Sequence, residues 1–284
     1  IMHPRVWEAS GHLEDFTDPL IECKKCHSRF RADHMADGRF VGQGMAKEKN
    51  QCPNCGGKEF TKPQQFNLMF KTFLGPVENK AHQAYLRPET AQSMFTDFKW
   101  VLETSRKKIP FGIAQIGKSF RNEITTGNFT FRSREFEIAE IEYFVKPGTD
   151  DQWFNKWVKE WESFFSDLGI KKKNLRQYEH PKEKLAHYSK KTVDIEYKFP
   201  WGWDELAGIA NRTDYDIKQH AKFSGKDLRY FDEETGEKYI PYVVEPTVGI
   251  ERIFLVLLID AYGEVKGGRT KTTKAVKEKE IVLR

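Results

Sequence analysis

The four cysteines of this chain constrain its fold more than any other feature, because they form two C-x-x-C pairs, Cys23 with Cys26 and Cys52 with Cys55. Each pair can hold two thiolates on one metal ion, and two pairs supply the ligands of a four-cysteine zinc site. The sequence therefore predicts a zinc-ribbon-like module at residues 23–62. A site of four cysteines has no open coordination position, so the role of the zinc would be structural. Free cytosolic thiols or two redox pairs are the alternatives.

The bulk composition is that of a soluble globular protein. The 284 residues are 38% hydrophobic and 31% charged, which is ample for a buried core. A net charge of +5 is compatible with a polyanionic partner but does not require one. We find no apolar run of about 18 residues and no signal peptide, and we expect a cytoplasmic protein with no membrane association. Since the chain opens on Ile1-Met2, we expect it to be part of a longer protein.

The middle of the chain predicts a helix followed by two antiparallel strands. Thr90 can cap a helix that reaches about Lys107, and Pro110 ends the pattern. Residues 111–120 and 134–145 are expected as strands, and the polar residues 121–130 as the turn between them.

The second half predicts two helices and two more strands. A stripe of aromatic and apolar residues at helical spacing follows Asp150, ends at Gly169 and is expected to pack in the core. The stripe consists of Trp153, Trp157, Trp161, Phe164, Phe165 and Leu168. Residues 193–199 and 239–244 are expected as strands, and 249–262 as a buried apolar helix. The basic residues 263–284 are expected to form a linker or an irregular surface segment.

Residues 112–119, GIAQIGKS, match the phosphate-binding pattern G-x-x-x-x-G-K-[ST]. This makes a P-loop NTPase a competing hypothesis. The pattern requires a helix directly after the glycine-rich loop. Here the four middle residues alternate like a strand, and a polar turn follows, so we disfavour this interpretation.

Three short motifs carry a family resemblance. FRNE (120–123), RSREF (132–136) with Glu140 four residues later, and GIER (249–252) resemble motifs 2 and 3 of class II aminoacyl-tRNA synthetases. YLRPETAQ (85–92), DIEYKF (194–199), GIANRT (208–213) and HPRVWEASGH (3–12) resemble the glycine-specific synthetases of the dimeric type. The resemblance extends to about residue 262.

The resemblance implies an α+β fold, with an antiparallel sheet flanked by helices and a zinc-ribbon-like insertion. It implies a glycine–tRNA ligase that uses ATP and Mg²⁺ to form glycyl-adenylate and then loads tRNA(Gly). It implies a homodimer in the full-length protein. The expected division is 1–22 as the start of the core without motif 1, 23–62 as the insertion, 63–262 as the core, and 263–284 as a linker to an absent anticodon-binding domain.

Arginine suits the ATP site because its planar group donates hydrogen bonds in pairs and stays charged. By the resemblance, Arg121 and Arg252 are catalytic: Arg121 would hold the α-phosphate, while Arg132 and Arg252 would hold the other two. Phe136 would stack on adenine, and Glu123 would accept from its amino group. The implied ATP-binding set is Arg121, Asn122, Glu123, Phe131, Arg132, Phe136, Glu205, Leu206, Gly249 and Arg252.

Glycine recognition calls for carboxylates around the ammonium group and a pocket that excludes larger side chains. The implied glycine-binding set is Arg31, Glu89, Glu137, Glu140, Glu245, Thr247 and Gly249. Phe136, Ile138 and Glu140 should share one strand face, with the first and last about 13 Å apart, which suits adenine at one end and ammonium at the other. Before substrate arrives, these glutamates could instead pair with nearby arginines.

Two motifs depart from the family pattern. The usual Glu-Pro-Ser is Glu245-Pro246-Thr247 here, which adds a methyl group near the expected glycine site. The turn carries Thr126-Gly127 where the family has Pro-Arg, so one cation for the tRNA end is missing. A non-catalytic synthetase-like module, such as a polymerase accessory protein, is the alternative function. Such a module need not keep Arg121, Arg132 and Arg252, whose presence argues against it.

Overall fold

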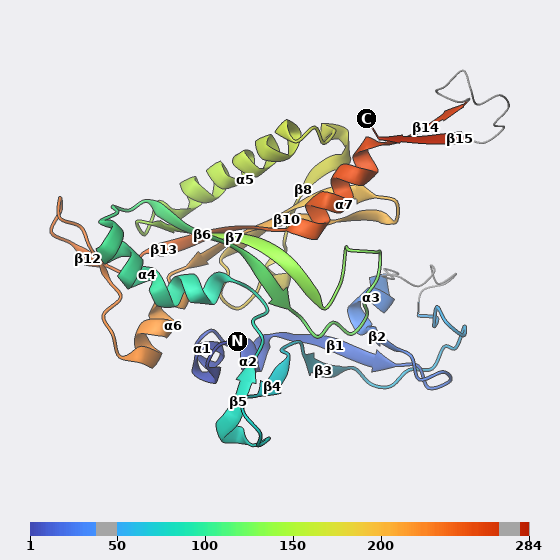
Figure 1. Ribbon diagram of the computed structural model, residues 1–284, viewed down its shortest axis with the longest axis horizontal. Coiled ribbons are helices and arrows are strands. Elements are labelled where there is room, and N and C mark those ends of the chain that lie inside the picture. The colour runs from blue at the N-terminus through green and yellow to red at the C-terminus, as the bar shows by residue number, and fades with distance from the viewer. Residues whose placement is uncertain (38–49, 267–278, 284) are drawn as a thin grey trace.

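The computed structural model describes residues 1–37, 50–266 and 279–283, and a six-stranded antiparallel sheet is its centre (Figure 1). In spatial order its strands are β6 (Phe111–Phe120), β7 (Glu135–Val145), β13 (Tyr242–Gly249), β10 (Gly202–Thr213), β9 (Lys191–Phe199) and β8 (Leu175–Glu179). The predicted antiparallel pair 111–120 and 134–145 is confirmed as β6 and β7. Because β6 runs through Gly112 to Ser119 and a turn follows it, the P-loop alternative fails.

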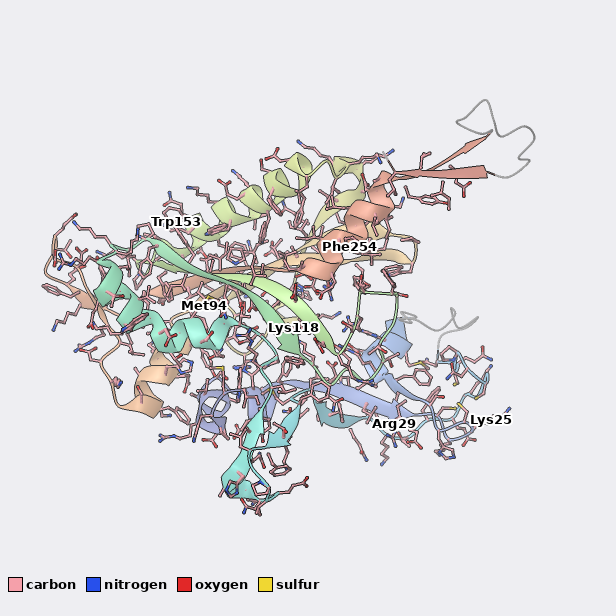
Figure 2. The ribbon with its side chains drawn as sticks, in the orientation of Figure 1. Lys25, Arg29, Met94, Lys118, Trp153 and Phe254 are labelled. Atoms are coloured by element: carbon pink, nitrogen blue, oxygen red, sulfur yellow. The ribbon has the colours of Figure 1, made fainter. Side chains whose placement is uncertain are left out.

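Helices α5 (Asp150–Asp167) and α7 (Ile250–Ala261) cover one face of this sheet. The core between them contains Phe154, Phe165, Ile195, Tyr197 and Val256, all at most 1% exposed. Figure 2 shows Trp153 of α5 and Phe254 of α7 on this side, and Met94 of another helix on the opposite side.

The predicted aromatic stripe of α5 is only partly in the core. Trp161 and Phe165 are buried, but Phe164 and Leu168 are each 39% exposed. Phe154 and Val158, which the stripe left out, complete the buried face. The helix predicted at 249–262 is present as α7, but it is not buried on all sides, since Phe254 is 53% exposed. One face of each helix meets the sheet, and the other does not.

The opposite face of the sheet is covered at one end by α4 (Ala91–Ser105) and α6 (Tyr215–Ser224). The predicted helix after Thr90 is confirmed, although the Thr90 side chain does not cap it. Its hydroxyl and amide donate instead to Glu140 on β7, which ties the helix start to the sheet. The short helices α1 (Pro4–Ala9) and α2 (His12–Asp15) pack against α6 and β3 (Gln64–Asn67) respectively.

The cysteines lie at one end of a small three-stranded sheet of β2 (Arg29–Arg31), β1 (Thr17–Glu22) and β3. Helix α3 (Ala32–Asp37) packs on β1 and β2. Strands β1 and β3 lie outside 23–62, so the cysteine loops extend a sheet that the flanking chain begins. Residues 38–49 of the predicted module are outside the described part, and the boundary at 23–62 stays a prediction.

The remaining elements are short. They are β4 (Lys71–Phe73), η1 (Lys80–His82), β5 (Gln83–Tyr85), η2 (Lys172–Asn174), η3 (Lys182–Lys184), β11 (Tyr230–Phe231), β12 (Lys238–Tyr239), β14 (Tyr262–Lys266) and β15 (Lys279–Leu283). Where we expected an irregular linker, β14 and β15 pair with each other, and residues 267–278 between them lie outside the described part. Among the described helices, none has the length and apolar character needed to cross a membrane.

Candidate active site

The register of the sheet brings the motif residues together on one face. Thr247 of β13 lies opposite Glu140 of β7, and Gly249 lies opposite Ile138. Since side chains two apart share a face, Phe136 joins Ile138 and Glu140, as the sequence predicted. A cavity of about 810 Å³ lies over this face.

Most of the predicted site residues line this cavity. They are Arg31, Glu89, Arg121, Glu123, Phe131, Arg132, Phe136, Glu140, Glu205, Glu245, Thr247, Gly249 and Arg252. Segments from almost the whole chain therefore meet at one place.

Asn122, Glu137 and Leu206 are not among the lining residues. Glu137 alternates with Phe136 and Ile138, so its side chain points to the other face, and its amide donates to Glu251. Leu206 is the extra residue of a β-bulge between Glu205 and Ala207, which leaves Glu205 facing the cavity and turns Leu206 into the core. The structure thus does not support these three as side-chain contacts of a ligand in the cavity.

Arg121 and Phe136 face each other at one end of the cavity. The Arg121 guanidinium lies 5.3 Å from the Phe136 ring centroid and 5.4 Å from that of Phe16. Its Nε donates to the Pro88 carbonyl at 3.1 Å. The guanidinium is thus fixed by rings and one carbonyl, without an ion pair among the described residues.

Arg132 and Arg252 are each held by one carboxylate. Arg132 Nη1 lies 3.2 Å from Glu123 Oε2, and Arg252 Nη1 lies 3.1 Å from Glu205 Oε2. The pKa of Glu205 lies below its ordinary value, because Arg252 and the other cavity arginines outweigh the effect of burial. Each of these two arginines therefore has one carboxylate partner at the cavity.

Beneath the cavity floor lies a fully buried ionic layer around Arg212, which is 1% exposed. It donates to both oxygens of Asp216 at 2.8 Å and to both oxygens of Glu245 at 3.0 Å. Glu89 lies 3.9 Å from Arg212 and 3.3 Å from His12 Nε2. These contacts fix the positions of two of the three carboxylates expected to meet the substrate ammonium.

The carboxyl groups of this layer have shifted pKa values. Burial alone would raise the pKa of Glu89, but His12 and Arg212 lower it below its ordinary value. Burial, with Glu140 and Glu89 nearby, raises the pKa of Glu245 to about 8 against the pull of Arg212. Burial and then Glu245 raise the pKa of Glu142 well above its ordinary value, and neither of its oxygens has a hydrogen-bond partner within the described residues.

The sequence reasoning missed the residues that support the site. Arg212 follows the apolar run Leu206–Ala210 within the same strand, β10, and a cation inside a buried strand was a usable signal. Asp18, which pairs with Arg31 at 2.7 Å, and His12 come from distant segments that no local pattern joins to the motifs. His180, Asp194 and Tyr178 also line the cavity without having been predicted as site residues.

Residues 70–262 match the family described as tRNA synthetase class II core domain (G, H, P, S and T). This chain belongs to that family. The predicted class II resemblance is thereby confirmed, and the class II core coincides with the sheet that carries the cavity.

Curated proteins with similar sequences include two glycine–tRNA ligases. This class II chain is 53% identical over 294 residues to the glycine–tRNA ligase of Thermobifida fusca, covering 100% of this chain and 63% of the relative. It is 52% identical over 290 residues to the glycine–tRNA ligase of Geobacillus kaustophilus, covering 96% of this chain and 63% of the relative. The chain thus spans somewhat under two thirds of the length of these relatives.

A solved structure supports the fold. Giardia lamblia prolyl-tRNA synthetase in complex with prolyl-adenylate matches with a TM-score of 0.55 and 19% identity, over 67% of this chain and 36% of that one. At this identity the likeness establishes the class II fold alone.

The four cysteines of this class II chain form one cluster. Their Sγ atoms all lie within 4.8 Å of one another, with Cys23 to Cys55 at 3.7 Å and Cys26 to Cys52 at 3.6 Å. Four thiolates at about 2.3 Å from one Zn²⁺ in a tetrahedron would be about 3.8 Å apart. Amides of Ser28, Asn54, Cys55 and Gly57 point at the sulfurs. The donor set and its spacing therefore fit zinc.

Proposed function

We propose that this chain is the catalytic core of a glycine–tRNA ligase. The observation that carries the proposal is the joint position of Arg121, Arg132 and Arg252 with Glu89, Glu140 and Glu245 in one cavity. The cations suit a polyphosphate, and the carboxylates suit an ammonium group. Identity above 50% to glycine–tRNA ligases supports glycine as the amino acid.

In the first step a carboxylate oxygen of glycine would attack the α-phosphorus of ATP. A new O–P bond forms, and the bond to the leaving pyrophosphate breaks. Both reactants are anions, so the negative charge that gathers at phosphorus must be met by fixed cations. Arg121 is suited to this because it forms no ion pair among the described residues, and Arg252 and Arg132 can exchange their carboxylate partners for the other phosphates.

Glycine would be selected because the cavity has too little room for the side chain of a larger amino acid. The Thr247 methyl lies 3.4 Å from where a Cβ on Gly208 would stand, so the methyl packs on Gly208. The Thr247 hydroxyl is buried without a partner among the described residues. This supports threonine as an adequate replacement for the family's serine, because its extra methyl has a place on the cavity floor against Gly208.

In the second step a terminal hydroxyl oxygen of tRNA(Gly) would attack the glycyl carbonyl carbon. An ester bond forms, the bond to the phosphate oxygen breaks, and AMP leaves. The expected tRNA contact at Thr126-Gly127 lies in the turn after β6, beside the cavity wall that carries Arg132.

Two metal ions belong to the proposal. Mg²⁺ prefers carboxylate and phosphate oxygens, and Glu205, whose side chain is 43% exposed in the cavity, could hold it together with ATP. Mg²⁺ would neutralise charge on the phosphates. Zn²⁺ would be held by Cys23, Cys26, Cys52 and Cys55 and would fix the loops at the end of the small sheet.

We also propose a cytoplasmic homodimer for the full protein. Ile116 of edge strand β6 is 69% exposed and Phe254 of α7 is 53% exposed. A second copy is a suitable cover for such apolar side chains, in keeping with the dimeric type that the sequence resembles.

Amino-acid-dependent ATP–pyrophosphate exchange tests the proposal directly. We expect exchange with glycine and not with alanine or serine. A folded protein that catalyses no exchange with any amino acid would instead support the non-catalytic synthetase-like module.

A further inference from the structure

The small sheet of β2, β1 and β3 has the cysteine cluster at its outer end and the cavity at its inner end. Cys23 directly follows β1, and β2 begins three residues after Cys26. Figure 2 shows Lys25, which stands between these two cysteines, at the outer end of the sheet. At the inner end Asp18 of β1 and Arg31 of β2 pair at 2.7 Å, and both line the cavity. Five residues of strand, or about 17 Å, separate Cys23 from Asp18.

The cysteine loops hold the chain that leads into β3 as well as β1 and β2. The Thr61 amide donates to the Glu22 carbonyl at 2.9 Å, and Cys23 forms an isolated β-bridge with Phe60. The second cysteine pair precedes these contacts in the chain, and β3 begins at Gln64. The position of all three strands at the outer end therefore depends on the loops that carry the four sulfurs.

Few apolar side chains stabilise this outer end. Its buried cluster consists of Ile21, Cys23, Phe30, Met35 and Cys52, so two of its five members are cysteines. Among the described residues, none of these five belongs to either core of the large sheet. Modules with so small a core usually require a metal ion, and metal binding then contributes directly to their folding. Loss of the metal would therefore disorder the small sheet and leave the cores of the large sheet intact.

The inner end of the small sheet contacts the turn that carries the predicted phosphate-binding arginines. Leu68, one residue after β3, accepts a hydrogen bond from the Asn122 amide at 2.8 Å. The Leu68 amide donates to the carbonyl of Phe16, one residue before β1, at 3.0 Å. The Phe16 ring in turn lies under the Arg121 guanidinium. The backbone on both sides of Arg121 is thus positioned by the ends of β1 and β3.

We propose that metal binding by the four cysteines and ATP binding in the cavity are coupled through the small sheet. With its outer end fixed, the sheet holds the turn and the Arg121 guanidinium where they can meet the phosphates. Without the metal, ATP would bind only the fraction of molecules in which the turn is in place, and this lowers its apparent affinity. The inference rests on the proposed ATP and zinc sites and adds a regulatory link between them.

The first part of the test measures ATP binding by equilibrium dialysis of the full protein with Mg²⁺ and without glycine, so that no adenylate forms. It compares the zinc-loaded protein with the same protein after treatment with a zinc-selective chelator. Cys52→Ser, which removes one ligand, provides a second metal-free form. Lys25→Ala is the matched control, because Lys25 is exposed between two cysteines and its loss leaves all four sulfurs in place.

The second part measures zinc affinity at buffered free zinc concentrations, with and without ATP and Mg²⁺. Coupling between two binding sites is reciprocal, so ATP must raise the affinity for zinc by the same factor as zinc raises the affinity for ATP. Far-UV circular dichroism of the metal-free forms reports whether the large sheet and its helices stay folded.

We expect ATP to bind about fivefold or more tightly to the zinc-loaded protein, the lower end of typical coupling between sites, and we expect the metal-free core to stay folded. Lys25→Ala should behave like the unaltered protein. Equal ATP affinity in the two forms, a zinc affinity that ATP does not change, or global unfolding without zinc would each overturn the inference. A protein that binds ATP but no zinc would overturn the zinc site and the inference with it. Failure to bind ATP in either form would overturn the proposed function itself.

Discussion

The arginines of the cavity wall and the arginine beneath its floor differ in their exposure and in their ion-pair partners. The side chains of Arg132 and Arg252 are 17% and 18% exposed, and each pairs with a single carboxylate at 3.2 and 3.1 Å. Arg212 is 1% exposed and meets two carboxylates through paired hydrogen bonds. The wall arginines can exchange partners with an incoming anion, whereas Arg212 has no access to one. The arginines of the cavity wall are therefore suited to bind a ligand, whereas the buried Arg212 stabilises the fold.

Replacing Arg212 should give the largest effect on stability. Arg212→Met would leave Asp216 and Glu245 buried without their cation, which typically costs about 3–5 kcal/mol. Urea unfolding at neutral pH measures it. The matched control is Lys218→Ala on α6. This variant removes an exposed ion pair with Asp214 and should change stability by less than about 0.5 kcal/mol. Equal losses in the two variants would contradict the scaffold role.

Replacing Arg121 should instead spare the fold and remove activity. Arg121→Gln would delete the cation expected at the α-phosphate, and we expect exchange to fall by about 10²–10³-fold. Arg229→Gln, at an exposed pair with Asp227, is the control. If the Arg121 variant unfolds, or if it catalyses ATP–pyrophosphate exchange at the normal rate, the proposed difference between the arginines of the wall and Arg212 of the floor is wrong.

The residues of the cavity wall were predicted from the sequence far better than those of the ionic layer beneath the floor. β6, β7 and the turn between them follow from local alternation and polar residues, and Arg121 and Arg132 lie in that turn, whereas Arg252 lies in the first turn of α7. The Arg212 layer joins residues from α2, the α4 start, β10 and β13, which are far apart in the chain and which only the folded sheet brings together. The bulge that turns Leu206 inward likewise depends on register with β9. Glu137 is different, because the alternation already invoked for Phe136 and Glu140 was enough to place its side chain on the other face of the strand.

Glu142 tests whether a buried carboxyl group of the floor stays protonated, because it has no hydrogen-bond partner among the described residues. Burial and Glu245 raise its pKa in the folded protein well above the ordinary value of 4.5, so the folded protein keeps this proton to a higher pH than the unfolded chain does. Its stability contribution is then fully present below about pH 4.5 and is lost as pH rises toward the folded pKa, because the unfolded chain ionises first. Glu142→Gln, which is neutral at every pH, should match the unaltered protein near pH 4.5 and be increasingly more stable at pH 6–8. Chemical unfolding across this range measures it, with Glu135→Gln, at an exposed residue of the same strand, as control. A difference that does not change with pH would mean that Glu142 is ionised in the fold.

The smallest effect is expected at Thr247, where wall and floor meet. Because its methyl packs on Gly208, Thr247→Ser should leave the preference for glycine over alanine within about threefold, well below the 10–200-fold of a methyl that contacts substrate. Exchange rates with the two amino acids measure the ratio. A large gain of alanine activity in the variant would place the methyl against the substrate α-carbon. Selection by size would then depend on Thr247 itself, and the packing of its methyl on Gly208 would not describe the state that binds glycine.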